Sequence, residues 1–362
     1  MDAALIWEWV IKSLILIFIL LGGFAYLTLY ERRALARIQV RIGPNRAGPW
    51  GLLQPIADAV KLIFKEELTP ARAYKAVFFL APIITVVPAT VIAAVIPWGP
   101  TVTIFGRPVQ LSIANINVGV LYLMAIASIA VYGIVLGGWS SNNKYAMLGG
   151  LRSSAQMISY ELALGLSFVA VILLGNSMSL TDIVEAQKSA WFVLLQPVGT
   201  AIFMIATLAE VNRAPFDMPE AEQELTAGYH SEYSGMKFAL FFMAEYEKMI
   251  VVSLITATLF FGGYLGPGIE RFPWLGPVYL LIKVVILLFW MIWVRATLPR
   301  IRYDRLMAFG WKVMLPLALA VVFITALGIL LEQLWLIPIL SVIAGGFVTL
   351  LVNRSLRRKA YA

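Results

Sequence analysis

Cysteine is absent from this chain of 362 residues, and histidine occurs once, as His230. Without thiols the chain can form no disulfide, no thiolate metal site and no ligand set for an iron–sulfur cluster. A single histidine also excludes the two-histidine ligation of a haem. The sequence therefore predicts no metal site and no cofactor bound by this chain, and any electron carriers must belong to other chains.

Charged residues are also scarce, at 13% of the chain, whereas a soluble domain has about 25%. Hydrophobic residues make up 61%, and the mean hydropathy is +0.86. These values place the chain among polytopic membrane proteins. The net charge of +8 does not require nucleic acid as a partner, because the basic residues gather in alternate loops, as they do in membrane proteins.

Long apolar runs predict nine membrane-spanning helices. Each run is long enough to cross about 30 Å of hydrocarbon at about 1.5 Å per residue. The runs cover residues 14–30, 77–97, 118–139, 157–175, 192–208, 238–264, 277–298, 313–331 and 335–352. The predicted fold class is all-α: a polytopic transmembrane bundle that forms a single membrane domain from residue 1 to residue 362.

The distribution of lysine and arginine predicts the orientation of this bundle. The loop 31–75 contains nine of them, and all loops and tails on its side together contain 21, against three on the opposite side. Basic loops stay in the cytoplasm, so the N-terminus is expected outside and the C-terminus inside. In the outer loop 101–113, apolar residues alternate around Gly106 and Pro108, which predicts a hairpin.

The cytoplasmic loop 31–75 contains an amphipathic segment. From Leu52 onward the apolar residues share one helical face, while Asp58, Lys61 and Lys65 share the other. Such a helix can lie flat in the membrane interface with its apolar side down. The pattern alone fits a surface-lying connector as well as a helix that lines a ligand site.

A second cytoplasmic loop, residues 209–237, is acidic against the basic trend. It contains the sequence AEVNRAPFDMPEAEQELTAGYHSEYSG between two predicted spans. Its acids are Glu210, Asp217, Glu220, Glu222, Glu224 and Glu232. Pro219 suits the first position of a helix, where negative charge is favoured. Crowded carboxylates can exchange protons near neutral pH, and the alternative is a solvated loop that docks on a basic partner.

Further acids lie within the predicted spans themselves. Glu161 lies about one turn into the fourth span, Glu210 closes the fifth, and Glu245 lies about two turns into the sixth. An ionisable residue inside the hydrocarbon is costly and therefore predicts a functional site. The alternative for Glu245 is a structural pair with Lys248, three residues later. For Lys248 and its neighbour Glu247, structural and functional roles remain equally open.

Several of these stretches together resemble one known family. They are Glu31-Arg32-Arg33, GLLQPIADAVK within residues 39–65, ISYE at the end of 140–161, PFDMPEAEQELTAGYHSEYSG, and RATLPRIRYDRLMAFGW from residue 295. The chain resembles the H-type membrane subunit of respiratory complex I, the bacterial NADH:quinone oxidoreductase, and the resemblance covers nearly the whole chain. In this family the subunit joins the membrane arm to the peripheral arm.

The resemblance implies a subunit that encloses the membrane end of a quinone chamber and takes part in proton translocation without being redox-active itself. It implies quinone-chamber residues Arg32, Arg41, Asp58, Lys61 and Phe64. It implies proton-coupling residues Glu31, Glu161, Glu210, Asp217, Glu220, Glu222, Glu224, Glu232 and Glu245. Quinone would be the substrate, and FMN and iron–sulfur clusters would belong to partner subunits.

The resemblance also implies partner subunits and a membrane for this chain. At one position the sequence departs from some members of the family. Expected partners are the peripheral-arm subunits of the quinone site and small neighbouring membrane-arm subunits, in the inner (cytoplasmic) membrane. Some members carry an acid in the third span just before the run AVYG, where this sequence has Ile129. Two other functions remain open: the anchor subunit of a related membrane-bound hydrogenase, and a stand-alone ion/proton antiporter.

Overall fold

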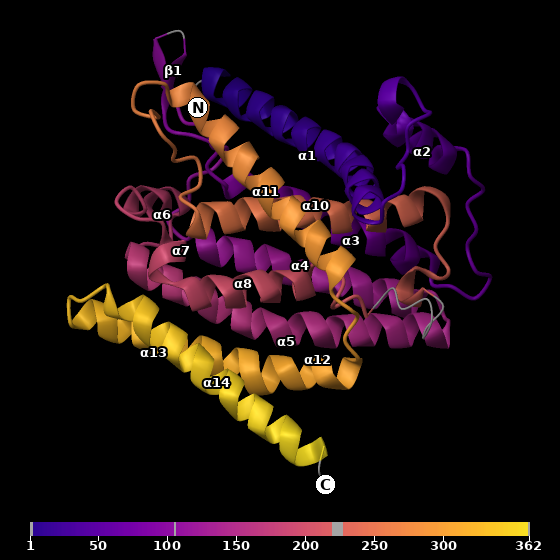
Figure 1. The fold of residues 1–362 in the computed structure, drawn as a ribbon. Helices are drawn as coiled ribbons and strands as arrows, with labels where there is room; N and C mark the ends of the chain where they lie inside the picture. Colours follow the sequence, from indigo (N-terminus) through magenta and orange to yellow (C-terminus); the bar gives the residue numbers. More distant parts are fainter. Residues whose placement is uncertain (1–2, 105, 219–226, 361–362) are drawn as a thin grey trace.

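Long helices form most of the computed structural model, which describes residues 3–104, 106–218 and 227–360 (Figure 1). The long helices are α1 (Ala3–Ile38), α3 (Lys75–Ile92), α4 (Gly119–Ser140), α5 (Lys144–Gly175), α8 (Pro197–Glu210), α10 (Gly235–Phe260), α11 (Gly276–Thr297), α13 (Leu315–Leu330) and α14 (Leu336–Ala360). Short helices are α2 (Gln54–Ile63), α6 (Leu180–Ala186), α7 (Phe192–Leu195) and α12 (Tyr303–Phe309).

Each of the nine predicted spans overlaps one of these long helices, so the predicted all-α polytopic class is confirmed. In the described part of the chain, 6 stretches are long and apolar enough to cross a membrane. Helix α8 and the segment Leu336–Val352 of α14 are apolar but shorter. Helix α10 has the length of a span but carries four charged residues, Lys237, Glu245, Glu247 and Lys248.

Several predicted boundaries were wrong. Helix α1 continues to Ile38, and α5 begins at Lys144 rather than at residue 157, because a helix does not end where its hydrophobicity ends. Helix α5 begins where Asn143 caps it, since the side chain of Asn143 accepts a hydrogen bond from the backbone N–H of Tyr145 at 2.9 Å. The predicted span 192–208 is broken at Gln196, directly before Pro197.

The helices pack in layers around α10. Helix α10 contacts α1, α3, α8 and α11, α4 lies between α3 and α5, and α5 contacts α8 and α13 (Figure 1). Helices α13 and α14 pack together on the side of the bundle opposite α1 and α11. The α3–α4 approach requires a glycine: a Cβ at Gly133 would lie 2.1 Å from Thr85 Oγ1. Small residues permit such close helix contacts in membranes.

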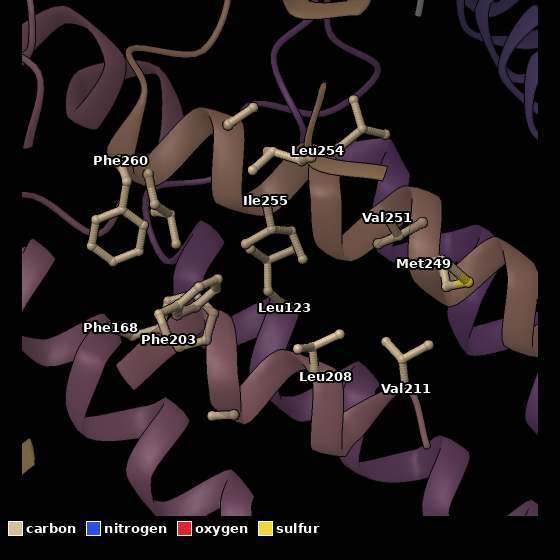
Figure 2. Close-up of a cluster of buried hydrophobic side chains, with 14 of the residues drawn as sticks. Leu123, Phe168, Phe203, Leu208, Val211, Met249, Val251, Leu254, Ile255 and Phe260 are labelled. Atoms are coloured by element: carbon tan, nitrogen blue, oxygen red, sulfur yellow. The ribbon is translucent and has the colours of Figure 1, made fainter. Parts of the chain in front are cut away.

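The main apolar core lies where α4, α5, α8 and α10 meet. Figure 2 shows side chains of all four helices directed toward one another, including Leu123, Phe168, Phe203 and Ile255. This core matters for function because the same four residues form part of the wall of a cavity that contains charged groups.

Two smaller predictions are also confirmed. The outer loop forms the antiparallel hairpin of β1 (Val102–Ile104) and β2 (Arg107–Val109), in which Val102 pairs with Val109. The amphipathic segment forms α2, and its residues Ile56 and Val60 are exposed. An exposed apolar face beside basic residues suits a helix that lies in the membrane interface.

Candidate functional site

Two buried acids and two arginines form an ion-pair network at one end of the bundle. Glu31 of α1 accepts hydrogen bonds from Arg295 of α11 and, at 3.3 Å, from Nη1 of Arg213. Arg213 Nε also lies 2.9 Å from Glu245 Oε1 of α10. Only 3%, 6% and 10% of the side chains of Glu31, Arg213 and Glu245 are exposed.

Arg213 holds this network together. Its guanidinium lies between the two carboxylates, and its carbon Cζ is 4.4 Å from the centre of the Tyr246 ring. Burial alone would lower the pKa of Arg213, but the carboxylates of Glu245 and Glu31 outweigh burial and raise the pKa above its usual value. Arg213 therefore carries a permanent positive charge next to two acids.

A cavity of about 60 Å³ contains the next group of ionisable residues. Glu161 of α5, Glu210 of α8 and Lys248 of α10 line it together with apolar side chains, and we call it the Glu210 cavity. Ser128 of α4 donates a hydrogen bond to Glu161. A cavity of this size has room for a few water molecules, which need polar partners such as these.

A smaller cavity of about 20 Å³ lies next to the ion-pair network, and we call it the Glu245 cavity. Its lining includes Glu245, Asn212, Tyr229 and, again, Lys248. The two cavities and the network thus form one continuous set of charges, which we call the buried charge series: Arg295, Glu31, Arg213, Glu245, Lys248, Glu210 and Glu161.

The predicted quinone-chamber residues fall into two groups. Arg32 of α1 donates to Asp58 of α2 at 2.6 Å, and Lys61 lies 3.6 Å from the same carboxylate, so the structure brings these three together. Arg41 lies apart from them, with its Nε bonded to Gln39 and its side chain in a separate open pocket of about 560 Å³. Phe64 is 84% exposed and shows no contact with Asp58 among the described interactions.

The acidic loop is only partly described. Glu210 joins the buried charge series, and Asp217 is partly buried. Glu232 accepts a hydrogen bond at 2.6 Å from Asn143, the residue that caps α5. Glu220, Glu222 and Glu224, and the helix predicted to start at Pro219, lie outside the described residues.

Sequence reasoning did not assign several residues of this site. Arg213 and Arg295 were not predicted, although a buried acid requires a nearby cation and Arg213 follows Glu210 by three residues. Glu247 is also buried, and its carboxylate accepts a hydrogen bond from Thr90 of α3 at 3.0 Å. Sequence spacing offered Lys248 as a structural partner of Glu245. In the structure, Glu245 forms its ion pair with Arg213 instead.

No group of three or more histidine, cysteine or acidic side chains in the described segments is arranged to hold a metal ion. Charge relay and proton exchange are the chemistry that the site offers. A series of alternating acids and cations in a region of low polarity responds strongly when any one member changes charge.

Comparison with known proteins identifies the family. A family model described as NADH dehydrogenase matches residues 11–326. The H-type subunit of the NADH-quinone oxidoreductase of Thermomicrobium roseum is 53% identical over 323 residues, which cover 86% of this chain and 93% of the relative. The chain belongs to the family of H-type subunits of NADH-quinone oxidoreductase.

Other members of this family are similar to this chain over nearly the same share of its length. The H-type subunit numbered 2 of Syntrophobacter fumaroxidans is 52% identical, covering 88% of this chain and 95% of its own length. The H-type subunit numbered 1 of Geobacter sulfurreducens is 51% identical, covering 90% and 95%. The chain is therefore a multi-pass membrane subunit of a multisubunit NADH-quinone oxidoreductase, complex I. This membership favours that assembly over a hydrogenase anchor or a stand-alone antiporter.

Proposed function

We propose that the chain forms the membrane side of the quinone chamber of complex I and couples quinone reduction to proton translocation through the buried charge series. One observation carries this proposal. Glu31 and Arg32 are adjacent on α1, where Arg32 binds Asp58 on the surface helix α2 and Glu31 binds Arg213 in the interior. Two successive residues thus connect the surface cluster to the buried charge series.

The coupling follows from electrostatics. Reduction of a quinone to a quinol consumes two electrons, which partner subunits with FMN and iron–sulfur clusters would deliver, and two protons. A charge change beside the Arg32–Asp58 pair alters the field on Glu31 and hence on Arg213 and Glu245. In a region of low dielectric constant, each neutralised carboxylate changes the most stable charge state of its neighbour. A proton would then move along the acids toward neighbouring membrane subunits.

The surroundings in this proposal follow from the arrangement of charge. The basic loop 31–75 and the acidic loop 209–237 would face the cytoplasm and contact the peripheral-arm subunits of the quinone site. Small membrane-arm subunits would receive the proton path at Glu161 and Glu210. The membrane would be the inner, cytoplasmic membrane of the cell, with the N-terminus outside.

The coupling part of the proposal is tested by Glu245→Gln in the purified complex, reconstituted in liposomes. The amide keeps the shape of the side chain but cannot be charged, so proton translocation driven by quinone reduction should fall while the assembly remains intact. Lys12→Met serves as control, because Lys12 binds Glu8 and the carbonyl of Gln110 at the opposite end of α1. Unchanged proton translocation in Glu245→Gln would refute a coupling role for Glu245.

The chamber part is tested by Asp58→Lys, which replaces the carboxylate that Arg32 and Lys61 share with a third cation. Quinone reduction should fall, while NADH oxidation by an artificial electron acceptor, which bypasses the quinone, should remain normal. Asp58→Asn keeps the size of the side chain and should have the smaller effect. If both activities fell equally in Asp58→Lys, the residue would serve assembly rather than the quinone.

A further inference from the structure

Lys248 occupies a special position in the buried charge series, because it lines both cavities. In the Glu210 cavity it faces Glu161 of α5 and Glu210 of α8. In the Glu245 cavity it faces Glu245, which lies one turn earlier on α10. No other described residue belongs to both linings, so Lys248 is the one side chain through which the two cavities meet.

The charges around Lys248 do not balance. Its ammonium interacts electrostatically with Glu210, Glu245 and Glu161, and Glu210 in turn repels Glu161. The buried charge series contains four carboxyl groups, Glu31, Glu245, Glu210 and Glu161, against three cations. If every acid were ionised, one negative charge would remain without compensation, and such a charge inside a membrane protein is costly.

The other titratable and polar groups near Lys248 supply no second cation for Glu161 and Glu210. Arg213 is shared between Glu31 and Glu245. Glu247 is turned to α3, where it binds Thr90. Tyr229 and Asn212 line the Glu245 cavity, and Ser128 of α4 binds Glu161. Compensation of Glu161 and Glu210 among the described residues therefore falls to Lys248.

Lys248 differs from Arg213 in its freedom to move. The planar guanidinium of Arg213 is fixed by two carboxylates and by the ring of Tyr246. A lysine has a flexible stem of four carbons and a compact ammonium. Cavities of about 60 and about 20 Å³ on its two sides give the ammonium space to turn and give room for water beside it.

We propose that Lys248 is the coupling cation of the buried charge series, and that its ammonium turns between Glu245 and the Glu161–Glu210 pair. This inference rests on the proposed function, because it names the residue through which the coupling passes. When the ammonium turns to Glu245, Glu161 and Glu210 together take up one proton that reaches them through water in their cavity. When it returns, it compensates one of the two carboxylates, and the pair releases that proton through the cavity water. Lys248 thereby positions a proton without contacting the quinone.

The first test measures protonation directly, in the full-length chain in liposomes, by infrared absorption of protonated carboxyl groups near neutral pH. Lys248→Met removes one positive charge, so we expect the absorption to increase by one carboxyl group. The increase should disappear in Lys248→Met combined with Glu210→Gln or with Glu161→Gln. Lys12→Met should not change the absorption. An unchanged spectrum in Lys248→Met would overturn the proposal.

The second test measures protons translocated per electron in the reconstituted complex. Lys248→Met should lose proton translocation, while NADH oxidation by an artificial acceptor remains normal. Lys248→Arg keeps the charge but carries a larger, less mobile head group, so it should show the wild-type infrared absorption and a reduced proton-to-electron ratio. A wild-type ratio in either variant would overturn the role of a mobile cation.

The two tests also separate this inference from the proposed function. The infrared measurement contains no quinone and no partner subunit, so it tests the pairing of Lys248 with Glu161 and Glu210 alone. If Glu245→Gln left proton translocation intact, the proposed coupling path would fail, whatever the infrared result. If Glu245→Gln abolished translocation and Lys248→Met did not, only the role of Lys248 would fail.

Discussion

Replacing Arg213 with methionine tests how much the ion-pair network contributes to the stability of the bundle. Across the 2.9 Å between Arg213 Nε and Glu245 Oε1, the Coulomb attraction is about 6 kcal/mol at an effective dielectric constant of about 20. Desolvation of the two groups offsets part of this energy. Removing one partner of such a buried pair typically costs about 3–5 kcal/mol, because the other charge remains uncompensated.

We therefore expect Arg213→Met to lower the free energy of unfolding by about 3–5 kcal/mol. Glu31 keeps Arg295 as a partner, so the loss should come mainly from Glu245. Arg213→Lys should restore the stability only in part, because one ammonium cannot reproduce the two separate contacts of the guanidinium. Unfolding can be followed by titration of the purified chain with SDS, with the fluorescence of its 11 tryptophans as the signal.

A double-mutant cycle makes this prediction refutable. Glu245→Gln removes the uncompensated charge, so Arg213→Met with Glu245→Gln should cost about 2–3 kcal/mol less than the sum of the single variants. Arg302→Met is the control, because Arg302 and Asp304 form an exposed pair that should contribute at most about 1 kcal/mol. If the effects of Arg213→Met and Glu245→Gln simply added, the pair would not act as one energetic unit.

Three further predictions concern the scaffold, each measured by the same SDS titration. Gly133→Ala should destabilise the chain by about 1–3 kcal/mol, because its Cβ would collide with Thr85 and the backbone of α3. Asn143→Ala should cost about 0.5–2 kcal/mol, since it removes the cap of α5, and it also frees Glu232. Burial raises the pKa of Tyr233 to about 12. The neutral hydroxyl therefore stabilises the folded chain fully below the unfolded pKa of about 10, and this contribution is lost as the pH rises through about 12. Tyr233→Phe should remove that part of the pH dependence, and an unchanged profile would contradict the assignment.

The sequence by itself determined the membrane class and the positions of the helices. An apolar run of about 20 residues is required to cross the hydrocarbon, and that requirement is local, so it can be read from composition along the chain. The hairpin at Gly106 and the amphipathic helix α2 follow in the same way from residues close in sequence. Helix boundaries were less accurate, because polar residues continue a helix beyond the membrane, as in α5.

Only the tertiary structure decided which charges meet. Glu31 and Arg213 are 182 residues apart, and Glu31 and Arg295 are 264 apart. Their contact depends on how α1, α10 and α11 are rotated and packed, which a hydropathy pattern does not encode. Sequence spacing suggested a pair of Glu245 with Lys248. In the folded chain Glu245 pairs with Arg213, and Lys248 lies between two cavities. The acids were thus identifiable one by one from the cost of burying charge, whereas their order in the buried charge series exists only in the folded bundle.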